Sequence, residues 1–450
     1  INPGELFIAL KGERFDGHTF ISESLVQKAS ALLVNKKNNL RKLLPSECTI
    51  PLIQVNDTLH ALGDLANAWM KQNRATVAAI TGTNGKTSTR EMTATVLEQT
   101  HHVLKPLHNW NNLIGLPLTL LRLEQHHEIA IMEMGMNRLG EIRRLSQIAQ
   151  PHIGLITNIS PVHLHYLKTL QNVAKAKGEL FESLTADDYA VVNSDDPLIV
   201  ELAQRSGAKK ITYGLNPNAQ ITATDISTTP RNETCFILKR SPESISIALK
   251  TPGTHTVYNA LAAAAIATHF GLSLNTIKEG LEQFMAFPGR METIPLANSV
   301  TLINDTYNAN PLSMDKALKT LVQVSGTGRS IAVLGDMLEL GESSHHFHQQ
   351  VGALIAELNL AAVFLMGPHA PVVAESARAL GTPPEVLHIV KNHEEVAGQL
   401  DQYVQAHDVI LFKGSRGMQI EKCLEDFLHL RNTGSSGLST TKSVQLGCNC

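Results

Sequence analysis

The chain has 450 residues, 43% of them apolar, and its 38 basic and 41 acidic residues leave a formal charge of −3. At roughly 150 residues per domain, this length predicts about three folded domains. The balanced charge argues against a polycationic nucleic-acid binder, and no apolar run reaches the roughly 18 residues of a membrane span.

Residues 1–74 alternate short apolar runs with turn-rich polar stretches, which predicts a small α/β domain. The chain opens at Ile1 with no initiator Met, no basic segment and no apolar signal core. We therefore expect a start inside a domain, with some N-terminal sequence missing. The five cysteines lack zinc-type C-x-x-C spacing, which favours a reducing compartment.

Residues 75–288 alternate strand-like with helix-like runs, the pattern of a parallel sheet covered on both faces. Three later runs of this segment alternate at period two without helices between them, which predicts a small antiparallel meander. The expected strands are Thr76–Ile80, Ile129–Met132, Ile153–Ile156, Ala190–Val192 and Ile211–Tyr213, followed by the meander runs Ile221–Ile226, Cys235–Leu238 and Ile245–Leu249.

Residues 289–430 repeat the order of strand followed by helix, which predicts a Rossmann-like domain. From residue 431 to 450 the composition turns to Gly, Ser and Thr, and we expect a disordered or artefactual tail without function. The fold class is therefore α/β. The strands expected in the last domain are Val300–Ile303, Ser330–Leu334, Ala361–Leu365 and Val409–Phe412, with a final helix over Met418–Leu428.

A strand, a small-residue turn and a helix stand in the order of a phosphate-binding loop near the start of the central segment. Such a loop needs glycines that let backbone N–H groups face phosphate oxygens, a Lys for the terminal phosphates and a hydroxyl for Mg²⁺. Ile80 stands where the general pattern has its first Gly, and Gly82 is the nearest substitute. The residues expected to bind ATP here are Gly82, Thr83, Asn84, Gly85, Lys86, Thr87 and Ser88.

Further functional groups are expected at the carboxyl ends of parallel strands. Glu133 ends one strand and offers a hard oxygen that would complement the loop hydroxyl on Mg²⁺. His163 follows the next strand, where a lone His is more often a simple hydrogen-bonding residue. Lys175 and Lys177 lie on a helix expected over Leu170–Leu184, where a Lys is usually a solvated surface group. Their spacing gives no reason to prefer either as a functional residue.

Histidine is frequent, with 20 in all, and it clusters at His101–His102, His126–His127 and His345–His348. His345 and His348 would share a helix face, so metal binding is an option. Because no Cys or carboxylate framework accompanies them, the pattern favours a solvated face.

Ordered motifs from residue 3 to 428 resemble those of the Mur ligase family. The runs Asp305–Met314, Leu334–Gly341 and Lys413–Gly417 resemble signatures of the branch that adds D-alanyl-D-alanine. The other matching motifs are Gly4–Gly12, Asp16–His18, Thr81–Thr87, Asn111–Pro117, Glu133–Gly135, Ala174–Glu179, Asn193–Asp196, Gly253–Ala260 and Phe287–Glu292.

The resemblance implies an ATP-dependent ligase that joins D-alanyl-D-alanine to UDP-N-acetylmuramoyl-tripeptide through an acyl phosphate. Such an enzyme is cytoplasmic and acts in peptidoglycan and cell-wall synthesis, and so in cell shape and division. The resemblance also implies ATP and two Mg²⁺ ions. Residues 1–74 would bind the UDP-sugar, 75–288 the ATP and 289–430 the dipeptide. We expect a monomer with small-molecule substrates and no nucleic-acid or membrane partner.

The family motifs imply a role for each matching residue in the central segment. Lys86 would hold the β- and γ-phosphates, Thr87 and Glu133 a first Mg²⁺, and His163 a second. Lys177 falls where many members carry a carbamylated lysine. Lys86, His163 and Lys177 are thus the expected catalytic residues.

Other matching residues would contact the nucleotide or the second substrate. Asn259 falls at the adenine-contacting position, and Arg290 and Asp305 match residues that grip the nucleotide phosphates and ribose. The residues implied in substrate binding are Asn111, Asn112, Asn308 and Ser415.

The chain also departs from the family pattern. His165 replaces a carboxylate shortly after the metal-binding His, which alters the expected metal surroundings. The family's Asp-Ser-Arg turn for uridine diphosphate would precede residue 1. Alternatives are an amino-acid-adding Mur ligase, folylpolyglutamate synthase, or a nucleotide-dependent switch that hydrolyses ATP without ligation. Meso-diaminopimelate and lysine remain alternatives for the third residue of the tripeptide.

Overall fold

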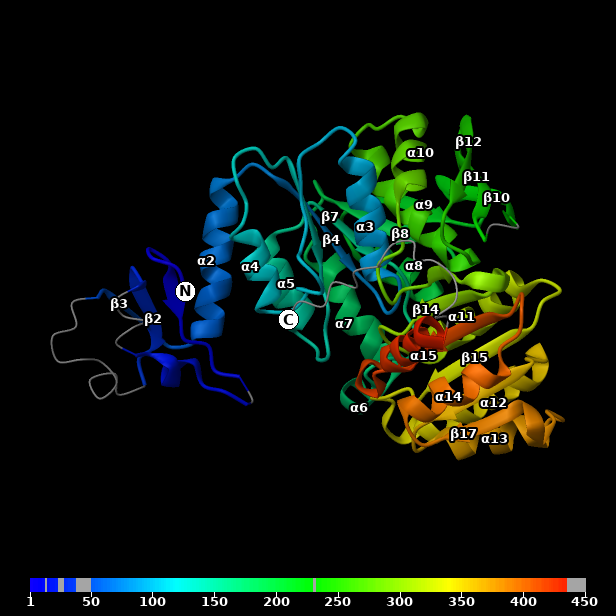
Figure 1. The fold of residues 1–450 in the computed structure, drawn as a ribbon. Coiled ribbons are helices and arrows are strands. Elements are labelled where there is room, and N and C mark those ends of the chain that lie inside the picture. Colours follow the sequence, from blue (N-terminus) through cyan, green and yellow to red (C-terminus); the bar gives the residue numbers. More distant parts are fainter. Residues whose placement is uncertain (13, 23–27, 38–49, 230–231, 435–450) are drawn as a thin grey trace. The chain divides into compact units, whose positions relative to one another are not determined.

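The computed structural model describes residues 1–434 except 13, 23–27, 38–49 and 230–231 (Figure 1). The chain forms two compact units, each with its own core. The first comprises 1–227, 235–249 and 255–284, and the second comprises 228–234, 250–254 and the chain from 285 onward. Both are built from mainly parallel sheets and helices, which confirms the α/β class.

The first unit begins with a small parallel sheet in the order β1-β2-β3. Its core is formed by Ala9, Ile21, Leu32 and Val34. Helix α2 follows, and its Asp57 N-cap accepts hydrogen bonds from the first-turn backbone. The bounds are β1 (Leu6–Ile8), β2 (Ala31–Asn35), β3 (Leu52–Val55) and α2 (Thr58–Gln72).

A nine-stranded sheet dominates the first unit, in the order β12-β11-β10-β9-β8-β7-β4-β6-β5. Its strands run parallel from β5 to β10. The bounds are β4 (Thr76–Thr81), β5 (Val103–Leu104), β6 (Ile129–Glu133), β7 (Ile153–Ile156), β8 (Tyr189–Asn193), β9 (Lys209–Gly214), β10 (Ile221–Thr228), β11 (Thr234–Arg240) and β12 (Glu243–Leu249).

The runs expected as a meander form β10, β11 and β12 at one edge of this sheet. Only Ser241 and Pro242 separate β11 from β12, a connection that only antiparallel neighbours permit. The meander therefore continues the main sheet. Strand β5 was not predicted, because two residues carry no periodicity.

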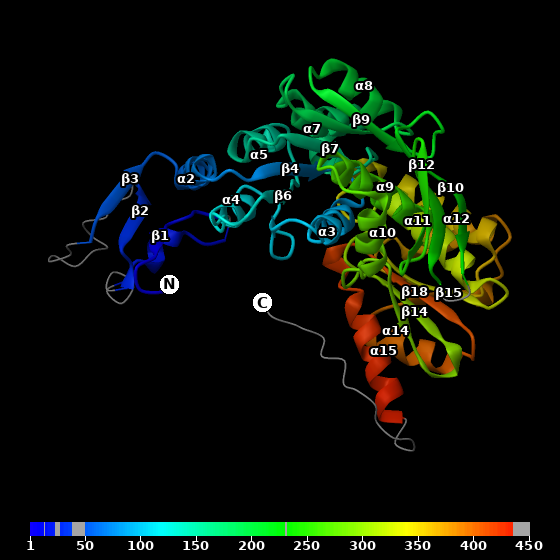
Figure 2. The ribbon, with the colours of Figure 1, turned by 90° about the horizontal axis from the view of Figure 1, so that it is seen from above.

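Helices cover both faces of the large sheet (Figure 2), which explains why its central strands are continuous apolar runs. One face packs against α3, α9 and α10. The opposite face packs against α2, α4, α5, α6, α7 and α8. The bounds are α3 (Lys86–Leu97), α4 (Gly115–Leu120), α5 (Glu141–Ala149), α6 (Leu164–Leu167), α7 (Leu170–Glu182), α8 (Pro197–Arg205), α9 (Thr254–His269) and α10 (Leu274–Gln283).

The second unit contains a six-stranded sheet in the order β13-β14-β18-β15-β16-β17. All its pairs are parallel except β13 with β14. Edge strands β13 and β17 were not predicted, because both are short and partly exposed. The bounds are β13 (Glu292–Pro295), β14 (Thr301–Asp305), β15 (Ser330–Gly335), β16 (Ala362–Met366), β17 (Leu387–Val390) and β18 (Val409–Lys413).

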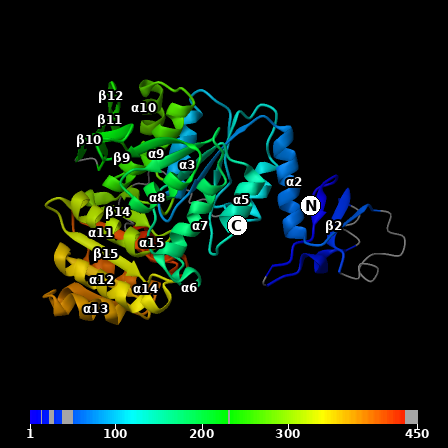
Figure 3. The ribbon, with the colours of Figure 1, turned by 180° about the vertical axis from the view of Figure 1, so that it is seen from behind.

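Helices α11, α12 and α13 cover one face of the second sheet, and α14 and α15 cover the other (Figure 3). Residues 431–434 close α15, and the rest of the expected tail lies outside the described residues. In the part of the chain that the structure describes, no helix is both long and apolar enough to cross a membrane. The bounds are α11 (Pro311–Ser325), α12 (Ser344–Leu358), α13 (Ala370–Ala379), α14 (His393–Tyr403) and α15 (Glu421–Gly434).

Candidate active site

The turn from β4 into α3 is tight because two glycines adopt positive φ angles. These angles are 145° at Gly82 and 79° at Gly85. A Cβ on Gly82 would lie 1.9 Å from Thr157 Oγ1, and one on Gly85 would lie 2.5 Å from Asn259 Oδ1. Both positions therefore require glycine. Helix α3 begins at Lys86, directly after the second of these glycines.

The segment after β7 holds this turn in place. The backbone N–H groups of Thr83 and Asn84 donate to the carbonyl and side-chain oxygens of Asn158, at 2.9 and 3.1 Å. Thr157 Oγ1 donates to the Asn84 carbonyl at 2.6 Å. The N–H groups of the first turn of α3, by contrast, have no intrahelical acceptor. Together with the helix dipole they form an anion site at the carboxyl end of β4.

A lysine adds positive charge to this anion site. The ammonium of Lys86 donates to the carbonyls of Gly82 and Thr83, at 2.9 and 3.0 Å. It therefore lies against the turn that precedes its own helix. A cation beside the N–H groups of a helix N-terminus is the arrangement that binds the terminal phosphates of a nucleotide.

Glu133 lies at the end of β6 with its side chain only 1% exposed. Its Oε2 accepts hydrogen bonds from Thr87 Oγ1 at 2.9 Å and Arg90 Nη1 at 3.1 Å. Its Oε1 accepts from Asn111 Nδ2 at 2.8 Å. A buried carboxylate beside a loop hydroxyl supplies the hard oxygen donors that Mg²⁺ prefers, so these residues fit that ion.

The structure distinguishes the two lysines that the spacing left equal. Lys175 is exposed, whereas Lys177 is only 3% exposed. Burial, and secondarily the charge of Lys86, hold the pKa of Lys177 well below its usual value. His163 is the N-cap residue of α6, in the segment that follows β7, and its backbone is left-handed with a φ of 52°.

Two asparagines from the motif list have defined structural contacts. Asn112 Oδ1 accepts from the N–H groups of Ile114 and Gly115, at 3.0 and 2.9 Å, and so stabilises the start of α4. Asn259 Oδ1 accepts from Thr89 Oγ1 on α3 at 3.2 Å. Asn259 therefore lies beside the phosphate-binding turn. Substrate binding by Asn112 and adenine binding by Asn259 stay predictions.

In the second unit the three signature runs meet at one edge of the sheet, where β14, β15 and β18 end side by side. The fully buried Lys413 forms an ion pair with Asp305 and donates to the Asn308 carbonyl at 3.1 Å. Ser415 Oγ accepts from the Leu338 N–H at 2.8 Å and donates to the Ala309 carbonyl at 3.2 Å. Loops that are distant in sequence thus form one connected polar cluster.

Arg290 and Asp305, the residues of this unit that are predicted to bind the nucleotide, contact neighbouring residues of the same unit. The guanidinium of Arg290 stacks on the ring of Tyr307, 3.8 Å from its centroid. Asp305 Oδ1 accepts from the Met291 N–H at 3.1 Å. Since Asp305 also pairs with Lys413, its carboxylate is held from two sides.

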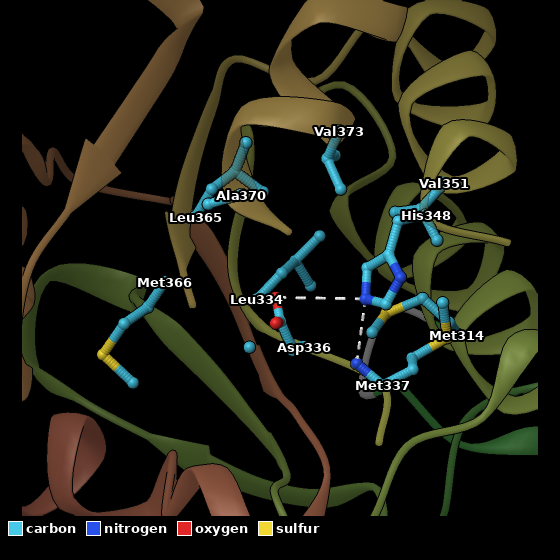
Figure 4. Close-up of a pocket in the computed structure, with 11 residues that line it drawn as sticks. Met314, Leu334, Asp336, Met337, His348, Val351, Leu365, Met366, Ala370 and Val373 are labelled. Carbon is cyan, nitrogen blue, oxygen red and sulfur yellow. Dashed lines mark hydrogen bonds and ion pairs between the residues drawn. The ribbon is translucent and has the colours of Figure 1, made fainter. Parts of the chain in front are cut away.

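A small pocket beside β15 contains the acidic residue of the second signature run (Figure 4). Asp336 accepts from His369 Nδ1 at 2.9 Å, and the carbonyl of Asp336 accepts from the Ser415 N–H at 3.1 Å. His348 accepts from the Met337 N–H at 3.1 Å and donates through Nδ1 to the Ser344 carbonyl at 2.7 Å. This cluster fixes the loop that follows β15.

Asp336, His348 and His369 could each offer a ligand atom to one metal ion. However, the two imidazole rings stack with their planes 12° apart and their centroids at 4.3 Å. A metal lies in the plane of each imidazole that binds it, so two parallel rings cannot share one ion. The sequence pattern favoured solvent exposure for both His345 and His348. This is correct for His345 but wrong for His348, because the side chain of His348 points from α12 into the core.

Sequence reasoning did not single out Arg90, Lys413 or Asp336 as site residues. Lys413 and Asp336 lay inside recognised motifs, so the signal was available. Arg90 follows Thr87 by three residues, which places both on one face of α3, but a charged helix residue usually faces solvent. Burial of its guanidinium depends on Glu133, 43 residues away in the chain.

A parallel sheet, a phosphate-type turn at the end of β4 and a buried carboxylate beside it define a nucleotide-binding α/β protein. Three family descriptions match the chain: "Mur ligase family, catalytic domain" over 1–70, "Mur ligase middle domain" over 80–267 and "Mur ligase, glutamate ligase domain" over 289–416.

Similar proteins span nearly the whole chain. The UDP-N-acetylmuramoyl-tripeptide–D-alanyl-D-alanine ligase of Escherichia coli is 37% identical over 94% of this chain and 90% of its own length. The Bacillus subtilis protein of the same name is 35% identical with the same coverage. The crystal structure of MurF from Acinetobacter baumannii superposes with a TM-score of 0.85 at 33% identity, over 95% of this chain and 91% of that one.

A further solved structure, MurF ligase from Thermotoga maritima in complex with ADP, has a TM-score of 0.84 at 27% identity, over 97% of this chain and 96% of that one. The chain belongs to the Mur ligase family, as the sequence motifs predicted. It is an ATP-dependent peptide ligase.

Proposed function

We propose that the chain joins D-alanyl-D-alanine to UDP-N-acetylmuramoyl-tripeptide with consumption of ATP, giving the pentapeptide precursor of peptidoglycan. The observation that carries this proposal is the convergence of the three signature runs at one edge of the second sheet. Two relatives named for this reaction, which are 37% and 35% identical over nearly the whole chain, support the proposal.

The reaction needs activation, because a carboxylate does not react with an amine until it carries a leaving group. The terminal carboxylate of the tripeptide attacks the γ-phosphorus of ATP, the bond to ADP breaks, and an acyl phosphate forms. The amine of the dipeptide then attacks the acyl carbon, loses a proton, and phosphate leaves. Lys86 and the N–H groups of α3 would hold the phosphates in line and neutralise their charge.

Mg²⁺ fits the oxygen donors of Thr87 and Glu133, and His163 would hold a second ion. When bound, the ions polarise the phosphoryl oxygens and neutralise developing charge. The hydroxyl of Thr87 can offer a lone pair to the metal while its proton remains donated to Glu133. The chain's own contribution is therefore a carboxylate held in place before the nucleotide arrives.

Lys177 is proposed to be carbamylated. Addition of CO₂ requires the neutral amine, and burial favours that form by lowering the pKa of Lys177. The resulting carbamate would give Lys177 a carboxylate. Lys177 belongs to the central segment, residues 75–288, which also contains the predicted metal ligands Thr87, Glu133 and His163.

The second unit is proposed to receive the dipeptide. Asn308 and Ser415 would contact it, while Arg290 and Asp305 would contact the nucleotide. We assign UDP-sugar binding to residues 1–74, ATP binding to 75–288 and dipeptide binding to 289–430. We further propose that the protein is cytoplasmic, since both ATP and the UDP-linked substrate are cytoplasmic metabolites. We also propose that it is a monomer.

One assay tests the function. ADP release is measured with UDP-muramoyl-tripeptides that carry meso-diaminopimelate or lysine, each with and without D-alanyl-D-alanine. We expect release that depends on both substrates, with one tripeptide preferred. ADP release that is independent of the dipeptide would identify a hydrolase or switch, and release with a single amino acid would identify a sister ligase.

A further inference from the structure

We propose that Arg90 is a positioning residue that fixes the carboxylate of Glu133 for the metal ion of the bound nucleotide. The inference rests on the proposed function, because it takes Thr87 and Glu133 as the oxygen donors to Mg²⁺. Its core is a geometric observation. Thr87 and Arg90 lie one helical turn apart on α3 and donate to the same oxygen, Oε2 of Glu133.

The guanidinium of Arg90 is held in one orientation. It is fully buried, and its Nε and Nη2 donate to Glu91 Oε1, at 3.0 and 2.5 Å. Its Nη1 donates both to the carbonyl of His108 at 2.9 Å and to Glu133. Lys105 holds the other oxygen of Glu91 at 3.0 Å. A planar fork that is fixed along two edges can impose its direction on the carboxylate it contacts.

Different residues hold the two carboxylate oxygens of Glu133. Asn111 holds Oε1, and Arg90 and Thr87 share Oε2. Without Arg90, Oε2 of Glu133 would lose a charged donor of fixed direction, so the buried carboxylate would be less firmly oriented. Partners that orient a metal ligand contribute to metal affinity without touching the metal.

Binding of Mn²⁺ in the presence of ADP tests the inference without requiring ligation. Electron paramagnetic resonance of the full chain reports the Mn²⁺ affinity, and ADP binding in EDTA reports the metal-free site. In Arg90→Met we expect roughly 10- to 100-fold weaker Mn²⁺ binding, the range typical of partners of metal ligands. Metal-free ADP affinity should change less than about twofold, because the α3 N–H groups and Lys86 remain.

Two milder variants keep the test valid if Arg90→Met does not fold. Arg90→Lys retains the charge and loses the fork, and Glu91→Gln loosens the anchor while Arg90 stays. Both should weaken Mn²⁺ binding by roughly 3- to 10-fold. The control is Arg205→Met, which removes a surface arginine paired with Glu201. It should leave Mn²⁺ binding unchanged.

The outcomes separate the inference from the function. Folded Arg90→Lys and Glu91→Gln proteins with wild-type Mn²⁺ affinity would overturn the positioning role. Equal losses of Mn²⁺ and metal-free ADP binding would also overturn it, since they indicate general damage to the turn. Normal Mn²⁺–ADP binding by the wild type without dipeptide ligation would refute the proposed function and leave the inference intact.

Discussion

Two lysines that interact near the phosphate-binding turn lie in different environments. The ammonium of Lys86 has two carbonyl acceptors, which stabilise its charge. Burial, and secondarily the charge of Lys86, lower the pKa of Lys177. The first is suited to act as a fixed cation for phosphate, and the second to react as a neutral amine.

Replacing Lys86 by Ala should abolish most ligation. The terminal phosphates would lose their cation, so we expect the rate to fall about 10²-fold or more. Steady-state ADP release with both substrates measures this, and the exposed Lys175→Ala is the control. Near-normal turnover in Lys86→Ala would refute the assignment of the phosphate site.

Replacing Lys177 by Ala should reduce the rate, and acetate or chloride should partly restore it. A small anion can occupy the space of the lost carbamate and supply its charge. We expect a loss of about 10-fold or more that bicarbonate does not reverse. Lys175→Ala, two residues away on the same helix, should behave as wild type under all three salts. An unchanged rate in Lys177→Ala would exclude the modification.

At the scale of elements, the shape of the β4–α3 turn depends on close approach by neighbouring segments. Gly85→Ala should be more damaging than the conformational strain of a positive φ alone predicts. Its Cβ would meet Asn259 at 2.5 Å, whereas Gly140, at a φ of 90°, has open space around it. We expect Gly85→Ala to cost about 2–3 kcal/mol and Gly140→Ala about 1 kcal/mol.

Thermal unfolding and ADP affinity measure this comparison. Gly85→Ala should lower both the unfolding temperature and the affinity for ADP. Gly140→Ala should lower only the unfolding temperature, because it lies at the start of α5. Equal effects of the two substitutions would show that contact with Asn259 does not shape the turn.

The loop after β15 should make stability depend on pH. Burial lowers the pKa of His348, whose Nε2 must stay unprotonated to accept from Met337. Asp336 and His369 face it, and His345 is the titratable neighbour on its own helix. The unfolded chain therefore binds more protons between the folded pKa and about 6.5, so stability falls as pH drops through that window.

His348→Gln should flatten this part of the profile, because the amide does not titrate. We expect the wild type to lose about 1 kcal/mol more than the variant between pH 7.5 and 5. Thermal unfolding midpoints at intervals across this range measure the difference. Parallel profiles for the two proteins would contradict the role of His348.

Most elements with strong periodicity were predictable, and the misses have physical causes. The central strands are buried on both faces, so their sequences are continuous apolar runs that mark them clearly. Strands β13 and β17 lie at sheet edges, where half-exposed side chains weaken the pattern. Part of the third-domain signature is also a local signal, because Asn310 and Ser313 form a capping box at the start of α11.

At the scale of the whole molecule, the predicted machinery is divided between the two units. Lys86 belongs to the first, and Arg290 and Asp305 belong to the second. We expect that bound ligands bring these predicted groups together and that closure keeps water from the acyl phosphate. We expect a smaller radius of gyration in solution scattering with a non-hydrolysable ATP analogue and UDP-muramoyl-tripeptide than without ligands. Equal compactness in both conditions would count against closure.

The sequence by itself determined the α/β class, the phosphate-binding turn and the family, because these depend on local order: strand, glycine turn, helix, and motifs in a fixed succession. It left Lys175 and Lys177 equal. The structure separates them, because Lys177 lies on the face of α7 that also buries Val173 and Phe181.

Only the tertiary structure decided which distant groups meet. The sheet order places β18 between β14 and β15, and this brings Ser415 and Lys413 against loops that precede them by up to 108 residues. The pairing of β4 with β6 likewise brings Glu133 to Thr87 and Arg90. Such contacts follow from strand order and core packing, which join segments across the chain and leave no mark in local periodicity.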